Sequence, residues 1–145
     1  MPYRQLTTYQ AVITQARAFR VLKNFMAKYL NNYGLTMTEW LLIGKIVDSG
    51  KAGIRLTDLA EMLRVELPVI TNLVNKAEKD GWIAKVTDLN DKRAKLVVAT
   101  DIGNEKACTL EGELRKATKE WLKDTDNEMI KGYFAIVGAL AQKEI

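Results

Sequence analysis

The sequence contains no histidine, one cysteine, one serine and two prolines among its 145 residues. The lack of histidine excludes a Ser-His-Asp triad, a Cys-His pair and any metal site that needs imidazole ligands. The lone cysteine, Cys108, has no partner for a disulfide within the chain, which favours a cytoplasmic location. The nine glycines form no Walker or dinucleotide-binding pattern. We therefore expect no enzymatic activity, no metal and no cofactor.

Long hydrophobic runs are also absent. The longest runs, such as residues 40–43, are far shorter than the roughly 20 apolar residues that cross a bilayer. The first ten residues lack the hydrophobic segment of a secretory signal. With 48% hydrophobic and 28% charged residues, the composition is typical of a single globular domain. We expect no membrane partner.

The formal net charge of +4 is distributed unevenly along the chain. Residues 1–31 carry five basic side chains and no acidic one, whereas residues 55–95 carry eight basic and seven acidic side chains. A mildly basic protein of this size is compatible with nucleic-acid binding. The near-neutral balance of residues 55–95 leaves a second interpretation open, a protein–protein adaptor that does not bind DNA.

Apolar residues recur at helical spacing in six segments and alternate in two. This pattern predicts helices over about 6–31, 36–49, 58–64, 68–79, 100–123 and 126–142, and a β-hairpin formed by strands over 82–87 and 94–99. A short extended piece is predicted over 54–56. Thr36 and Glu39 fit a capping box, Thr57 fits a helix cap, and Pro68 fits the first position of a helix. The predicted fold class is mainly α with a small β-hairpin wing.

The helices predicted over 58–64 and 68–79, their short connection and the polar-tipped hairpin together form a winged helix-turn-helix. The apolar stripe of helix 68–79 must pack against the rest of the domain, so its opposite face projects outward. A helix of this width fits the major groove of DNA, where an asparagine amide can bond an adenine edge through two hydrogen bonds. The candidate DNA-binding residues are Pro68, Thr71, Asn72, Asn75 and Lys76 on the helix, and Asn90, Asp91, Lys92 and Arg93 on the wing.

Residues 35–103 resemble the MarR family of transcriptional regulators. The matching residues, in order, are Leu35-Thr36, Trp40, Leu42, Leu59-Ala60, Leu63, Val65, Leu73-Val74, Gly81, Asp88, Asp91-Lys92-Arg93, Thr100 and Gly103. The chain departs from the family pattern at Leu67-Pro68-Val69, where small hydroxyl residues are usual, and at Lys85, where arginine is common.

The resemblance implies a homodimer whose first, fifth and sixth helices interlock. Residues 1–34 and 100–145 would then form the dimerisation region, and residues 35–99 the DNA-binding region. It also implies that Asp91 orients Arg93, which enters the minor groove of a palindromic site. The sequence thus predicts a sequence-specific, DNA-binding transcriptional regulator, a repressor acting as a homodimer on double-stranded DNA.

The resemblance further implies a small phenolic or lipophilic effector that binds near the junction of the two regions. The candidate ligand-binding residues are Tyr9, Phe19, Tyr33 and Trp40, each of which also fits a place in the core or in an interface. Trp82 is expected to pack in the core beneath the wing. Cys108 is expected to be a small buried residue of the fifth helix rather than a redox sensor.

Overall fold

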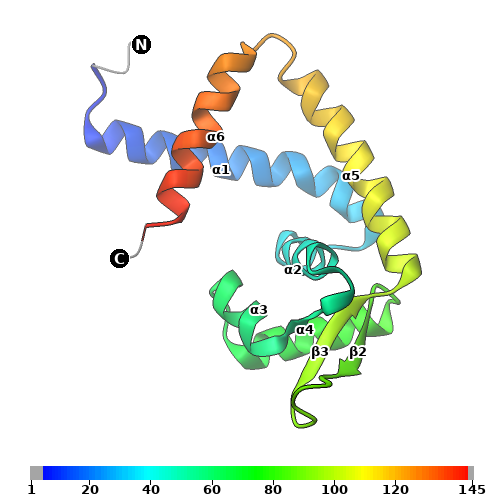
Figure 1. The fold of residues 1–145 in the computed structure, drawn as a ribbon. Helices are drawn as coiled ribbons and strands as arrows, with labels where there is room; N and C mark the ends of the chain where they lie inside the picture. Colours follow the sequence, from blue (N-terminus) through cyan, green and yellow to red (C-terminus); the bar gives the residue numbers. More distant parts are fainter. Residues whose placement is uncertain (1–4, 144–145) are drawn as a thin grey trace. The chain divides into compact units, whose positions relative to one another are not determined.

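The structure is a computed structural model that describes residues 5–143, so Arg4 of the basic N-terminal segment lies outside the described range. The chain divides into two compact units, Met1–Gly112 and Glu113–Ile145. In chain order the elements shown in Figure 1 are α1 (Thr8–Leu30), η2 (Asn31–Tyr33), α2 (Met37–Asp48), η3 (Gly50–Ala52), β1 (Ile54–Arg55), α3 (Leu56–Leu63), α4 (Leu67–Lys79), β2 (Ile83–Thr87), β3 (Lys95–Ala99), α5 (Asp101–Trp121) and α6 (Asn127–Ala141). The predicted fold class, mainly α with a small wing, is confirmed.

Side chains satisfy the free backbone N–H groups at the starts of the first two helices. At α1 a full capping box forms, in which Thr7 Oγ1 accepts from the Gln10 N–H and Gln10 Oε1 accepts from the Thr7 N–H. At α2, Thr36 Oγ1 accepts from the Glu39 N–H at 3.2 Å, but the predicted reciprocal bond does not form. The reason is that the Glu39 carboxylate instead accepts a hydrogen bond from Lys76.

The helix-turn-helix begins earlier than the sequence predicted. α3 starts at Leu56 rather than at residue 58, and the prediction that Thr57 caps it was wrong. The N-cap is Arg55, which is still extended because it pairs with Leu96 in the sheet. α4 starts at Leu67, which puts Pro68 at the second helical position, where a backbone N–H would have no partner within the helix.

The wing is part of a three-stranded antiparallel sheet in the order β1-β3-β2. Strands β2 and β3 form the predicted hairpin, with Ile83 opposite Ala99 and Thr87 opposite Lys95. Strand β1, which lies within the extended piece predicted over 54–56, places Ile54 opposite Val97. This pairing ties the base of the wing to the segment that leads directly into α3.

The core of the first unit lies between α2, α3, α4 and the sheet. Its largest fully buried side chains in these elements are Leu42, Ile46, Leu59, Ile70, Val74, Ile83 and Val97. Burying each of these side chains stabilises the fold by about 1.5–3 kcal/mol relative to leaving it in water. Because Ile70, Val74 and Ala77 occupy one buried stripe of α4, the opposite face of this helix is left exposed.

The chain leaves the wing through a tight junction between β3 and α5. Thr100 Oγ1 accepts from the Gly103 N–H at 2.9 Å and donates to the Gly81 carbonyl at 2.6 Å. Trp82 is buried here, as expected, and Lys106 Nζ lies 5.2 Å from the centre of a Trp82 ring. The junction therefore anchors the first turn of α5 to the base of the wing.

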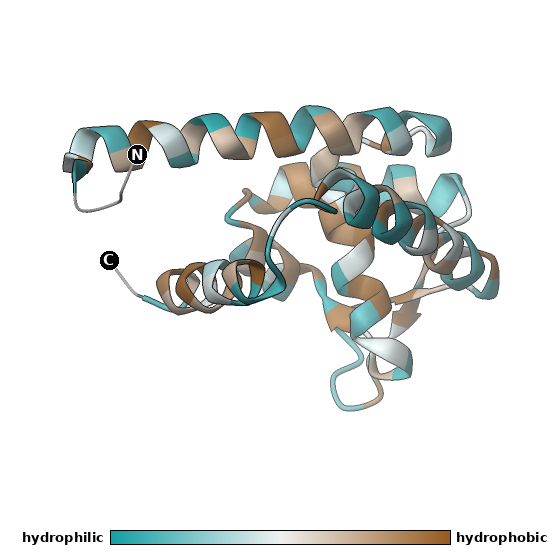
Figure 2. Cartoon of the chain, turned by 90° about the horizontal axis from the view of Figure 1, so that it is seen from above, coloured by the Kyte–Doolittle hydropathy of each residue, from teal (hydrophilic) through white to brown (hydrophobic). Residues whose placement is uncertain are grey.

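α1, in the first unit, and α6, in the second, each leave apolar side chains in solvent. Figure 2 shows hydrophobic segments recurring along α1 and along α6. The exposed large apolar residues of these two helices are Tyr9, Val12, Phe19, Val21 and Leu22 in α1, and Met129, Tyr133, Phe134, Ile136, Val137 and Leu140 in α6. Over residues 5–143, no helix has both the length and the apolar character that crossing a bilayer requires.

Candidate nucleic-acid interface

The outward face of α4 carries the predicted helix residues, but not all of them are equally available. Pro68, Asn72, Asn75 and Lys76 are exposed, whereas Thr71 is half-buried and its hydroxyl donates to the Leu67 carbonyl. Lys79 is exposed as well and lies seven residues after Asn72, two turns further along the same face. The sequence analysis did not include Lys79, although helical periodicity alone could have found it.

Lys76 is held by an ion pair with the start of α2. Its Nζ atom lies 2.7 Å from Glu39 Oε2, and this hydrogen bond raises the pKa of Lys76, so its ammonium group stays protonated at neutral pH. The Glu39 side chain is largely shielded from solvent, whereas that of Lys76 is about half exposed. The contact joins α4 to α2 and leaves part of the Lys76 ammonium facing outward.

Asn75 is engaged by Lys85, which projects from β2. Lys85 Nζ donates a hydrogen bond to Asn75 Oδ1 and lies 3.7 Å from Glu78 Oε1. The Lys85 backbone N–H also donates to Glu78 Oε2 at 3.4 Å. Lys85 was not among the predicted site residues, because its position in an alternating strand does not reveal a partner on the preceding helix.

A buried carboxylate organises the wing. Asp88 accepts hydrogen bonds from the Asn90 backbone N–H at 2.9 Å and from Arg55 at 2.8 Å. These contacts, the bond from Asn90 first, hold the pKa of Asp88 below its ordinary value. The carboxylate thus links the wing loop to β1, a pairing that the sequence did not indicate, because Arg55 lies 33 residues away.

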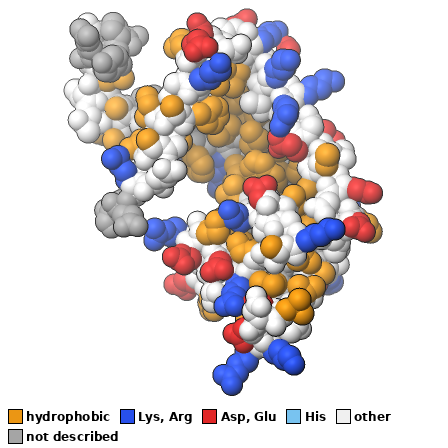
Figure 3. Space-filling view, in the orientation of Figure 1, with side chains coloured by type: hydrophobic (Ala, Val, Ile, Leu, Met, Phe, Trp, Pro, Cys, Tyr) orange, Lys and Arg blue, Asp and Glu red, His pale blue; other side chains and the backbone are white. Residues whose placement is uncertain are grey.

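The tip of the wing carries the remaining predicted residues, and all of them are exposed: Asn90, Asp91, Lys92 and Arg93. Figure 3 shows basic side chains projecting from this end of the domain. Asp91 Oδ1 accepts from the Arg93 backbone N–H at 3.0 Å, so the contact between the two residues shapes the loop. Within the described chain, the guanidinium of Arg93 makes no ion pair.

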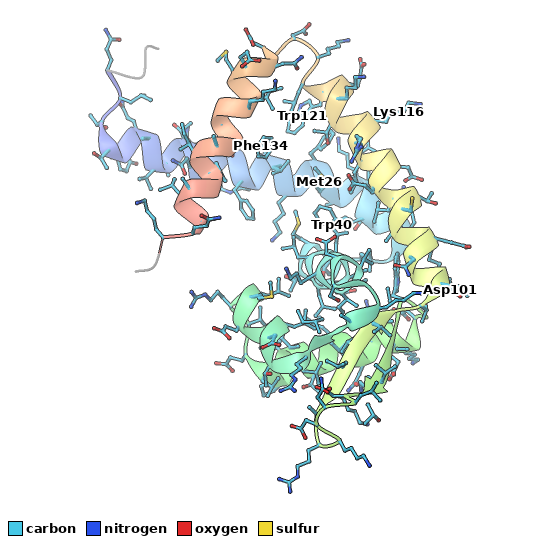
Figure 4. All side chains as sticks on the ribbon, viewed as in Figure 1. Met26, Trp40, Asp101, Lys116, Trp121 and Phe134 are labelled. Carbon is cyan, nitrogen blue, oxygen red and sulfur yellow. The ribbon has the colours of Figure 1, made fainter. Side chains whose placement is uncertain are left out.

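A cavity of about 680 Å³ lies in the first unit beside α2. Its walls include Trp40, Lys45, Met62, Trp82 and Cys108. Figure 4 labels Trp40 on α2. Two indole rings and a thioether together form a surface that suits an aromatic molecule.

The other three predicted ligand residues lie elsewhere. Tyr9 and Phe19 are exposed on α1, and Tyr33 packs against Trp82 with ring centres 6.3 Å apart. Cys108 is exposed at the cavity wall, so the expectation that it is buried was wrong. Helical spacing placed Cys108 on α5 correctly, but it could not show that this face of α5 borders a cavity.

Two short helices joined by a tight turn and followed by a hairpin that pairs with β1 define a winged helix-turn-helix. Residues 35–95 match the model of the MarR family. This match bears out the resemblance to the MarR family seen in the sequence, over the region that carries the helix-turn-helix and most of the wing.

One similar protein of known role matches about half of this chain. The transcriptional activatory protein BadR of Rhodopseudomonas palustris is 37% identical over 71 residues, a match that covers 48% of this chain and 41% of BadR. The match therefore spans less than half of BadR.

Solved structures show the same fold over nearly the whole chain. CouR of Rhodococcus jostii RHA1, bound to p-coumaroyl-CoA, has a TM-score of 0.81 at 16% identity. The match covers 97% of this chain and 98% of the CouR chain. Sco3205, a MarR family regulator of Streptomyces coelicolor in complex with DNA, has a TM-score of 0.78 at 22% identity, with 94% and 88% of the two chains covered.

Proposed function

We propose that this protein is a cytoplasmic, sequence-specific DNA-binding transcriptional regulator that represses its target as a homodimer bound to a palindromic operator. One observation carries the proposal: the exposed polar face of α4 belongs to the same small domain as a wing tip with two adjacent exposed cations, Lys92 and Arg93. The match of residues 35–95 to the MarR family model and the DNA complex of the structurally similar Sco3205 support it.

The proposed binding mode follows from the dimensions of the elements. The major groove admits an α-helix, and base edges there carry distinct patterns of donors and acceptors. In this mode α4 lies in the major groove, with Asn72 and Asn75 facing bases and Lys76 facing a phosphate. The wing tip reaches the neighbouring minor groove, where Arg93 is the residue that enters it.

The proposed dimer rests on the apolar faces of the terminal helices. α1 and α6 together hold eleven of the twenty large hydrophobic residues that are exposed in the described chain. Such apolar surface is stabilised when another surface covers it. We assign dimerisation to residues 1–34 and 100–145 and DNA binding to residues 35–99, with two half-sites about one helical turn, roughly 34 Å, apart.

A small phenolic or lipophilic effector is proposed to occupy the cavity beside α2 and to release the protein from DNA. The cavity volume of about 680 Å³ falls in the range of sites for small molecules.

Salicylate and p-coumarate are suitable probes, because Trp40 and Trp82 in the cavity wall should report binding by a change in fluorescence. Gly44, whose added Cβ would meet open space, also lines the cavity. A Gly44→Leu variant should lose the fluorescence response and keep its DNA affinity.

Selection from a random DNA library tests the proposal as a whole. The full-length protein should enrich an inverted repeat, and in a reporter assay that repeat should lower transcription from an adjacent promoter when the protein is present. Failure to enrich any sequence at low salt would contradict the proposal. It would favour the alternative of a protein–protein adaptor, in agreement with the near-neutral charge of residues 55–95.

A further inference from the structure

The contact between Lys85 and Asn75 restricts what the Asn75 side chain can offer to DNA. Lys85 is well held, because its side chain is only 24% exposed, its Nζ atom lies near Glu78, and its backbone N–H donates to the same carboxylate. α4 and β2 pack against each other, so the two side chains meet across a formed contact between elements. The orientation of the Asn75 amide is therefore fixed before any DNA arrives.

The chemistry of the two groups fixes which end of the amide faces Lys85. An ammonium group has three donors and no acceptor, so only the Oδ1 atom of Asn75 can bond to it. The Nδ2 group, with two N–H donors, is left at the exposed end. The ammonium charge next to Oδ1 also repels a further hydrogen-bond donor, such as the N6 amino group of adenine, from the same oxygen.

An asparagine that reads adenine uses its oxygen as an acceptor and its nitrogen as a donor together. Asn75 has its oxygen engaged and presents donors only. In the major groove guanine is the base that presents two adjacent acceptors, N7 and O6.

Building on the proposed DNA-binding function, we infer that Asn75 reads a guanine in each half-site and that Lys85 is the positioning residue that excludes adenine. This replaces the expectation from the sequence that Asn75 bonds an adenine edge. Lys85 sets the base preference through the orientation of Asn75, without itself needing to contact the base.

The test compares selected sequences for the unaltered protein and three variants. Asn75→Ala identifies the base pair that Asn75 reads, since preference should relax at one position of each half-site. The unaltered protein should prefer guanine there. Lys85→Met keeps an aliphatic chain and frees Oδ1, so the guanine-to-adenine ratio at that position should fall by about tenfold.

Lys95→Met serves as the charge control, because Lys95 is an exposed residue of β3 and has no contact with Asn75. The Lys95→Met variant should bind all DNA sequences more weakly by the same factor, and it should leave unchanged the base preferred at the position that Asn75 reads. The inference is overturned if the unaltered protein prefers adenine at that position, if Asn75→Ala relaxes no position, or if Lys85→Met leaves the ratio unchanged. If the unaltered protein selects no sequence, the proposed DNA-binding function fails, and the inference fails with it.

Discussion

Gly103, in the first turn of α5, occupies a place where no other residue fits. A Cβ atom built at this position would lie 2.0 Å from the Trp82 carbonyl oxygen, which is a backbone atom that cannot rotate away. The Trp82 carbonyl also accepts the Thr100 N–H at 3.1 Å, so moving it would break the junction between the wing and α5. Steric exclusion of any side chain thus explains why glycine occupies position 103, one of the positions that match the family pattern.

We predict that Gly103→Ala lowers the free energy of unfolding by about 2 kcal/mol or more, because the methyl group forces the backbone apart. Urea denaturation followed by circular dichroism measures the effect. Gly112→Ala is the matched control on the same helix, since an added Cβ there meets nothing within 4 Å. The control should raise stability by about 0.5–1 kcal/mol, as expected for alanine in a helix. Equal stabilities for the two variants would contradict the steric explanation.

Arg93 offers a second test at the level of one side chain. Arg93→Ala should weaken operator binding at least tenfold, because the exposed guanidinium is the proposed contact to the minor groove, and it should leave the fold intact. Electrophoretic mobility shifts with the selected operator measure the change. Lys116→Ala, which removes the same charge from an exposed position of α5, should have little effect. Unchanged affinity of the Arg93 variant would refute its role.

At the level of elements, the wing depends on a carboxylate that must stay ionised. Asp88 bonds the Asn90 N–H and Arg55, and its pKa is held below the ordinary value. A depressed pKa in the folded state means that the carboxylate stabilises the wing above its unfolded pKa of about 4. This contribution is lost as pH falls through the folded pKa, because the protonated group no longer pairs with Arg55.

Asp88→Asn should therefore lower the melting temperature at pH 7 by a few degrees, and the difference from the unaltered protein should narrow as pH falls below about 4. Thermal unfolding of both proteins, followed between pH 7 and pH 3, measures the difference in melting temperature and how it changes with pH. Asp91→Asn makes the same change of charge at the exposed tip and should shift the melting temperature less. A difference that stays constant down to pH 3 would show that the charge of Asp88 is not what stabilises the wing.

The sequence predicted which elements form more reliably than where they begin. Periodic apolar residues identified all six helices and the hairpin, since a helix or strand must bury one face locally. The start of α3 was missed because it is decided by the pairing of Arg55 with Leu96, a contact distant in the chain. The capping box predicted at α2 does not form completely for a similar reason, since the Glu39 carboxylate accepts a hydrogen bond from Lys76, 37 residues away.

In the candidate site, too, local features could be predicted from the sequence, whereas contacts between distant residues could not. Spacing along α4 was enough to identify an outward face, because the buried residues fix the direction of the others. It could not reveal that Lys85 engages Asn75, or that Cys108 borders a cavity. Both facts depend on how separate elements pack, which local patterns do not encode.

For the whole molecule, the apolar surface of α6 predicts how the proposed dimer can be broken. Ile136 is 64% exposed in the single chain. Ile136→Glu places a charge on this apolar face and should shift the molecular mass in sedimentation equilibrium from that of a dimer to the 16.4 kDa of one chain. Leu89→Glu, at a wing residue that is 96% exposed, should leave the dimer intact. A dimer that survives the change at Ile136 would place the interface elsewhere.

The ion pair between Lys76 and Glu39 bears on how the complete protein responds to ionic strength. In the proposed complex, the Glu39 carboxylate neutralises part of the charge that Lys76 brings to a phosphate. This contact should therefore add less to the salt dependence of the association constant than a contact from an unpaired lysine. If DNA binds as proposed, the slope of the association constant against salt concentration should therefore indicate fewer phosphate contacts than there are lysines and arginines facing the duplex.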